Sequence, residues 1–179
     1  MSFHYEELQP GFGDHCWRVH KFGGTSVANA DCFLQVAKII EDQLDVDRES
    51  IIDDALGDDD NVVEPVVNLA VVVSAMGGKP KVTDLLLSAV RHASMREHDK
   101  VEEVLGVVLE KHERCLNALF DDEGEEYSEE KNRLLQVIQG GLDDIRDILK
   151  TVSLMKWQAE RISEVVSGYG ELWSSQILT

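Results

Sequence analysis

Two glycine-containing segments carry residue types that could bind phosphate. Residues 21–26 read Lys-Phe-Gly-Gly-Thr-Ser, and residues 74–79 read Ser-Ala-Met-Gly-Gly-Lys. Glycines let main-chain N–H groups approach phosphate oxygens, while a lysine beside hydroxyl groups adds charge and hydrogen bonds. This chemistry suits a polyphosphate. On spacing alone, however, a Gly-Gly pair is a turn about twice as often as a phosphate cradle.

The spacing excludes both common nucleotide-binding fingerprints. A Walker loop needs Gly-x-x-x-x-Gly-Lys-Ser/Thr, but Gly78-Lys79 is followed by Pro80 and the first glycine is missing. A dinucleotide fingerprint needs a third glycine, which follows neither residues 11–13 nor residues 168–170. Each glycine loop can therefore be interpreted either as a turn or as a phosphate-binding loop.

Cysteine and histidine pairs do not complete a metal site. Cys16 with His20, and His112 with Cys115, lack a third and a fourth ligand at metal-site spacing. His112 and Cys115 also fall on an apolar helical stripe, which predicts core positions. No Ser-His-Asp or Cys-His set is evident, so the sequence predicts no metal centre and no nucleophile with its base.

The elements that would position the two loops are predicted strands and helices. Residues 16–22 and 66–73 read as strands, and the second is a continuous apolar run typical of a parallel sheet. Helices are predicted from Asn29, where asparagine can cap the first turn, and from about Thr83. Further helical periods follow over 101–119, 134–152 and 162–173, with Gly140-Gly141 as a possible kink in the second. This order predicts an α/β layer fold with crossover connections.

Charge and composition narrow the class of protein. The 179 residues contain 17 Lys and Arg against 35 Asp and Glu, a net charge of −18. Such a charge argues against nucleic-acid binding and against adhesion to anionic membranes. The 43% hydrophobic content suffices for a core, and no apolar run approaches the roughly 20 residues of a membrane span. Three widely spaced cysteines predict a reducing compartment without a disulfide framework.

Two segments are predicted to lie outside the packed domain. Residues 1–15 show no steady period and no leader pattern, and they read as an N-terminal tail. The segment from about 41 to 65 is strongly acidic. Ile51, Ile52, Ala55 and Leu56 could form one apolar edge of a short helix, but the composition favours a mostly solvated insertion. Its carboxylates do not form the Asp-x-Asp-x-Asp-Gly loop of a calcium site.

Three ordered motifs resemble the aspartate kinase family. Residues 21–27, KFGGTSV, are similar to the first strand and loop of that family. Residues 71–78, VVVSAMGG, followed by 81–86, KVTDLL, are similar to its second strand and loop. Residues 167–176, SGYGELWSSQ, resemble its SGHGELWSAQ-type segment. Together with Trp17 to His20, these motifs look most like the bifunctional aspartokinase–homoserine dehydrogenases.

The resemblance implies the N-terminal portion of the three-layer α/β/α amino-acid kinase fold, helix-rich after the second strand, within residues 16–179. It also implies transfer of the γ-phosphoryl group of ATP, with Mg²⁺, to the side-chain carboxylate of L-aspartate. An ionised carboxylate needs no general base, so positioning and charge stabilisation do most of the work. The missing nucleophile–base pair agrees with such a reaction.

The family's functional residues carry over position by position. Lys21 would be the catalytic cation that neutralises charge on the transferring phosphoryl group. It would share the nucleotide-binding loop with Gly23, Gly24, Thr25 and Ser26. Ser74, Thr83 and Glu171 would bind the aspartate, with Glu171 accepting a hydrogen bond from its ammonium. No metal ligand is carried over.

Some features depart from the family pattern. Residues 77–80, Gly-Gly-Lys-Pro, lengthen the second loop, and Tyr169 stands where the matching segment often has histidine. The sequence ends at Thr179, ahead of the second half of the kinase domain, so the resemblance is to a truncated member. The chain alone is therefore expected to have weak or no kinase turnover.

Two further interpretations compete with a kinase. A non-catalytic binding or regulatory protein derived from an aspartate kinase would act as a homodimer, or through a protein partner on the face exposed by truncation. Apolar helix faces would mediate either contact. The other interpretation is a generic acidic α/β module, which would require the three ordered motifs to resemble aspartate kinases by chance. The expected location is intracellular: cytoplasmic, or plastid if the protein is from a plant.

Overall fold

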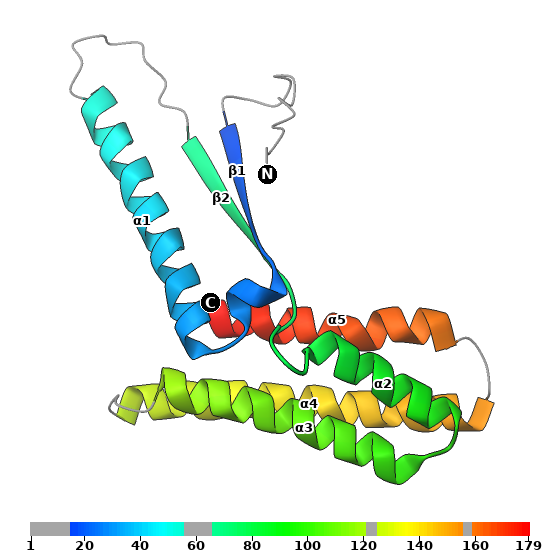
Figure 1. The fold of residues 1–179 in the computed structure, drawn as a ribbon. Coiled ribbons are helices and arrows are strands. Elements are labelled where there is room, and N and C mark those ends of the chain that lie inside the picture. The colour runs from blue at the N-terminus through cyan, green and yellow to red at the C-terminus, as the bar shows by residue number, and fades with distance from the viewer. Residues whose placement is uncertain (1–14, 56–65, 121–124, 156–158) are drawn as a thin grey trace.

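The structure of the protein is a computed structural model that describes residues 15–55, 66–120, 125–155 and 159–179. Within these ranges the chain forms a helix-rich α/β structure with a small parallel sheet (Figure 1). This confirms the α/β class. In chain order the elements are β1 (His15–Phe22), the 3-10 helix η1 (Gly24–Val27), α1 (Ala30–Ala55), β2 (Val66–Val73), α2 (Val82–Ser94), α3 (His98–Leu119), α4 (Glu125–Met155) and α5 (Ala159–Leu178).

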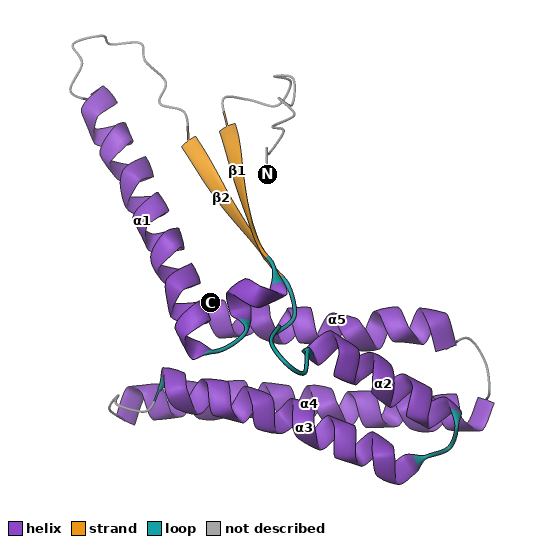
Figure 2. Cartoon of the chain, viewed as in Figure 1, coloured by secondary structure: helices purple, strands orange, loops and turns teal. Residues whose placement is uncertain are grey.

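The two predicted strands are confirmed, and they pair with each other. β1 and β2 are parallel, in a register that runs from His15 opposite Val66 to Phe22 opposite Val73. Parallel neighbours need a long crossover, which α1 supplies. Figure 2 shows both strands standing apart from the layer of helices and entering it at their carboxyl ends. Both glycine loops therefore begin at the same edge of the sheet.

Helix α1 begins as predicted but extends further. The side chain of Asn29 caps its first turn by accepting a hydrogen bond from the Cys32 main-chain N–H at 3.0 Å. Phe33 and Val36 are buried on its inner face. The helix continues to Ala55, so the first part of the acidic segment is helical, because residues 30–55 contain no glycine or proline. The rest of that segment and residues 1–14 lie outside the described ranges.

The hydrophobic core lies between the four helices after β2. Helix α2 packs against α3, α4 and α5, and Figure 1 shows these four helices grouped together beneath the strands. The helical stripes predicted over residues 101–119 and 134–152 are confirmed. The largest fully buried side chains of the core are Met76 of the second loop and, on the helices, Leu86, Leu105, Leu116, Ile138, Leu142, Ile145 and Trp173.

Two helices differ in detail from the predicted pattern. On α5, Val166 and Trp173 are buried, but Val165 and Leu172 are 57% and 52% exposed, because only one face of this helix meets its neighbours. Helix α4 runs through Gly140-Gly141 as one helix. A Cβ atom on Gly141 would lie 2.9 Å from Nε1 of Trp173, so this glycine allows the indole to approach closely.

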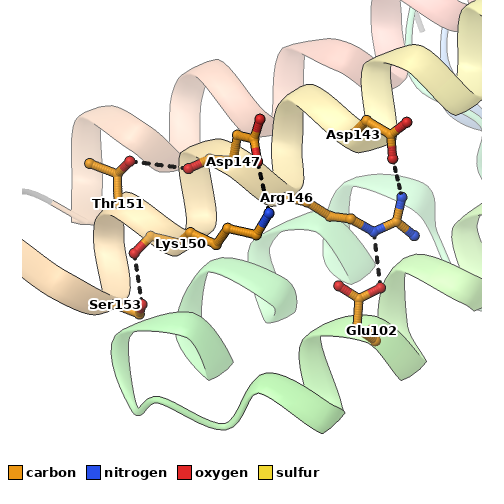
Figure 3. Close-up of polar contacts among 7 residues, drawn as sticks. All are labelled: Glu102, Asp143, Arg146, Asp147, Lys150, Thr151 and Ser153. Carbon is orange, nitrogen blue, oxygen red and sulfur yellow. Dashed lines mark hydrogen bonds and ion pairs between the residues drawn. The ribbon is translucent and has the colours of Figure 1, made fainter.

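Ion pairs on the surface connect α3 with α4 (Figure 3). The Nε of Arg146 donates to Glu102 on α3 at 2.9 Å, and its Nη1 donates to Asp143 at 2.7 Å. Lys150 pairs with Asp147 one turn further along α4. Exposed pairs of this kind contribute about 0–1 kcal/mol each, so they align the helices more than they stabilise them.

The core positions predicted for His112 and Cys115 are confirmed. Both side chains are buried, and the thiols of Cys32 and Cys115 are free. Burial raises the pKa of the Cys115 thiol to about 12, so this thiol stays protonated and unreactive at neutral pH. Among the described helices, none has the length and apolar character needed to cross a membrane.

Candidate functional site

The two glycine loops meet directly at the carboxyl edge of the sheet. After β1 and β2 end, the main-chain N–H of Ser74 donates to the carbonyl of Phe22 at 3.0 Å. The N–H of Gly77 then donates to the carbonyl of Gly24 at 2.9 Å. These bonds continue the pairing of the strands into the loops. Ligands of open α/β sheets bind at such an edge.

One glycine of each pair is required by packing. A Cβ atom on Gly77 would lie 2.2 Å from the carbonyl oxygen of Gly24, and one on Gly24 would lie 3.0 Å from the carbonyl oxygen of Ala75. The other two glycines are exposed. Nothing lies within 4 Å of a Cβ on Gly23, whereas a Cβ on Gly78 would lie 3.3 Å from the Nζ of Lys111, and Gly78 has a positive φ of 82°. The turn interpretation therefore fits Gly24 and Gly77, while Gly23 and Gly78 leave main chain accessible to a ligand.

The third motif reaches the same place from α5. A Cβ atom on Gly170 would lie 2.8 Å from the Cβ of Ala75 and 3.0 Å from Cγ1 of Val82. Buried Ser174 donates its hydroxyl hydrogen to the Gly170 carbonyl at 3.0 Å. Helix α5 is thus pressed against the second loop and the start of α2. Three segments that are far apart in the sequence converge there.

The side chains predicted for the site differ in exposure. Lys21, Thr25 and Glu171 are exposed, whereas Ser26, Ser74 and Thr83 are half-buried. The main-chain N–H of Ser26 donates to the Gly23 carbonyl at 2.8 Å, which closes the first loop into a 3-10 turn. Among the described residues, no hydrogen bond or ion pair joins the side chains of Lys21, Ser74, Thr83 and Glu171. Their segments are brought together, and their functional groups remain available to a ligand.

Sequence reasoning missed a lysine beside the second loop. The Nζ of Lys111, on α3, donates to the carbonyl oxygen of Pro80 at 2.9 Å. Burial, and secondarily the nearby Arg114, lower the pKa of Lys111. The contact joins residues 31 positions apart, so no local spacing could have indicated it. The one feature of the sequence that could have indicated this contact is the position of Lys111, directly before His112 and beside the apolar stripe of α3.

A separate hollow lies between the start of α4 and the end of α5. Its volume is about 770 Å³, and Phe120, Tyr127, Glu130, Arg133 and Gln176 are among its lining residues. None of the predicted site residues lines it. Arg133 in this hollow is already paired with Glu130. The convergence of the three segments, and not this volume, therefore marks the candidate site.

Within the described ranges, no group of three His, Cys, Asp or Glu side chains is arranged to hold a metal ion. The glycine loops have a different chemistry, which suits an anion. Two adjoining loops with open main chain and a strand-end lysine define an α/β protein with a candidate phosphate site.

Comparison with known proteins identifies the relatives of this chain. No protein-family profile matches it. It is 31% identical over 163 residues to the chloroplastic bifunctional aspartokinase/homoserine dehydrogenase 2 of Arabidopsis thaliana. Over 162 residues it is 32% identical to enzyme 1 of the same plant, and the enzyme of Daucus carota is 30% identical. The matches cover about nine-tenths of this chain and 14% of each relative.

These findings confirm the resemblance inferred from the three motifs. The chain is an aspartate-kinase-related protein, similar in sequence to the bifunctional aspartokinase–homoserine dehydrogenases. It spans about one-seventh of the length of the relatives it matches, and those relatives are named as chloroplastic enzymes.

Proposed function

We propose that the chain contributes the phosphate-binding part of an aspartate kinase site within the amino-acid kinase fold. In this reaction a side-chain carboxylate oxygen of L-aspartate bonds to the γ-phosphorus of ATP, while the bond from that phosphorus to the leaving ADP oxygen breaks. The observation that carries the proposal is the convergence of both glycine loops and the Gly170 segment at one edge of the parallel sheet.

Each proposed role rests on the chemistry of its group. Lys21 would offset negative charge on the γ-phosphoryl group, and residues 23–26 would present main-chain N–H groups and hydroxyls to phosphate oxygens. Ser74, Thr83 and Glu171 would hold aspartate, with the Glu171 carboxylate accepting from its ammonium. The absence of a general base fits a nucleophile that is already ionised.

Magnesium would arrive bound to ATP. Mg²⁺ keeps several waters and is commonly held by substrate phosphates with one or two carboxylates, so a preformed cage of protein ligands is not required. Because the relatives are named chloroplastic, we propose a plastid location for the protein.

Replacing Lys21 with alanine should weaken binding of Mg·ATP by about tenfold, the loss typical of one charge-assisted hydrogen bond. The chain carries a net charge of −18, so a polyanion depends on local positive charge. Titration calorimetry of the full chain measures the change. Lys150→Ala is the matched control, because Lys150 pairs with Asp147 on α4. Equal affinity in wild type and Lys21→Ala would contradict the assigned role.

The second candidate function is a non-catalytic binding protein derived from an aspartate kinase. The observation that favours it is an exposed apolar face on the sheet. The register places Trp17 and Val19 of β1 on the same face as Val72 of β2, with exposed fractions of 65%, 62% and 48%. Parallel sheets are normally covered on both faces, so this face suits a protein contact.

We propose a homodimer through this sheet face, in place of the apolar helix faces expected from the sequence, at about 0.15 M salt. At that salt the screening length is about 8 Å, so repulsion between highly charged copies no longer opposes short-range apolar contact. Sedimentation at low salt and at 0.15 M salt measures the state, and Val19→Lys should return the chain to a monomer. A wild-type monomer under both conditions would speak against this second function. A folded chain that binds neither ATP nor aspartate would favour it.

A further inference from the structure

Lys111 is the side chain of α3 that reaches the second glycine loop. Its Nζ donates to the Pro80 carbonyl at 2.9 Å, and a Cβ atom on Gly78 would lie 3.3 Å from the same Nζ. The lysine therefore lies against the loop at exposed Gly78 and at Pro80, the residue two before α2 begins. It connects the loop to the core of the helical layer, where the neighbouring His112 is fully buried.

The partner of Lys111 sets it apart from other lysines of the helices. Lys100 and Lys150 pair with carboxylates three residues away, on Glu97 and Asp147. Lys111 instead uses a main-chain carbonyl on another element, in a chain with 35 acidic residues. It is half-buried, and burial also lowers its pKa. Removing an ammonium from water costs free energy, and a specific main-chain bond offsets part of that cost.

Besides the bond from Ser74 to Phe22 at its start, the loop has two main-chain bonds on either side of Pro80. The Gly77 N–H donates to the Gly24 carbonyl at 2.9 Å, and the Val82 N–H donates to the Met76 carbonyl at 3.0 Å. Lys111 holds the Pro80 carbonyl between them. A loop fixed at this middle point keeps Gly77 seated against the first loop.

We propose that Lys111 is a positioning residue of the phosphate site: it holds the second glycine loop in the conformation in which both loops present their main chain to one ligand. This inference rests on the proposed function, because it assigns a role within the same site. Lys111 acts through the loop and takes no part in the bond changes.

Amide hydrogen exchange of the full chain tests the positioning. Lys111→Met keeps the aliphatic stem and removes the ammonium, so exchange at the Gly77 and Val82 amides should become about tenfold faster. Lys111→Arg supplies N–H donors again and should restore slow exchange. Lys150→Met, which removes an exposed lysine from α4, should leave both amides unchanged. Unchanged exchange in folded Lys111→Met would overturn the proposal.

Mg·ATP titration of the same variants separates this inference from the proposed function. Lys111→Met should bind Mg·ATP about tenfold more weakly, and Lys111→Arg should recover most of the affinity. If wild type binds no ATP, the proposed function fails, while the exchange data still decide whether Lys111 holds the loop. If wild type binds ATP and Lys111→Met binds it equally well despite faster exchange, the positioning role fails alone. Lys111→Leu, which also lacks a hydrogen-bond donor and has the same expectations, replaces Lys111→Met if the latter does not fold.

Discussion

Gly77→Ala is expected to lower the free energy of unfolding by about 3 kcal/mol, the upper range for overpacking. The new methyl group would lie 2.2 Å from the Gly24 carbonyl oxygen and 2.4 Å from its carbonyl carbon. Both are main-chain atoms, so the clash cannot be relieved by rotating a side chain. The loops must separate, which breaks the hydrogen bond from Gly77 to Gly24. Urea unfolding measures the change, and Mg·ATP affinity should fall with it.

Gly106→Ala is the matched control for this substitution. Gly106 is exposed within α3, and nothing lies within 4 Å of a Cβ atom there. Alanine has the higher helix propensity, so this variant should gain about 0.5–1 kcal/mol. A Gly77→Ala protein as stable as wild type would show that the two loops do not touch as described.

His112 is expected to make the fold about 3 kcal/mol less stable as the pH falls from 7 to 4. Burial lowers the pKa of this imidazole from 6.5 to about 4. Its Nδ1–H donates to the Val108 carbonyl at 2.7 Å, its Nε2 has no partner among the described residues, and its ring meets Trp173 edge-on. A proton on Nε2 would therefore be buried without an acceptor.

The sign follows from proton uptake. Between pH 6.5 and 4 the unfolded chain binds a proton at His112 and the folded chain does not, so stability falls as the pH falls. The fall of this pKa from 6.5 to about 4 corresponds to about 3 kcal/mol of stability, which is fully lost below pH 4. The carboxylates titrate in both wild type and His112→Gln, so the difference between the two proteins in the pH dependence of the free energy of unfolding isolates the contribution of His112. Equal pH dependence of unfolding in the two proteins would contradict the assignment.

The fold could be predicted where apolar residues repeat with a regular period. Residues 66–73 are apolar except for Asn68, and the buried stripes of α3 and α4 follow the helical period, so each pattern indicated which element forms and which residues it buries. The helical end of α1 was missed because its residues 45–55 are dominated by acidic side chains. When a helix lacks a regular pattern of apolar residues, only the helix propensity of its residues and the absence of glycine and proline distinguish its sequence from that of a solvated loop.

The site could be predicted only in part, for a related reason. Strand ends and glycine pairs are local signals, and they identified both loops. The difference between Gly23, which is open, and Gly24, which packs on the second loop, depends on main chain from residues 75–77. The contact of Lys111 with Pro80 depends on how α3 crosses that loop. Neither contact leaves a pattern in the neighbouring sequence.

The parallel pairing of the strands has a consequence for the order of folding. His15 lies opposite Val66 and Phe22 opposite Val73, so partners in the register are 66 − 15 = 51 positions apart. Closing a loop of this length costs conformational entropy before the strands gain any hydrogen bonds from pairing. Helices α2 and α3, in contrast, are joined by only three residues, so their contact costs less entropy. We therefore expect the helical layer to form first and the sheet to close on it afterwards. The two glycine loops meet only at that last step, so the candidate phosphate site is expected to form last.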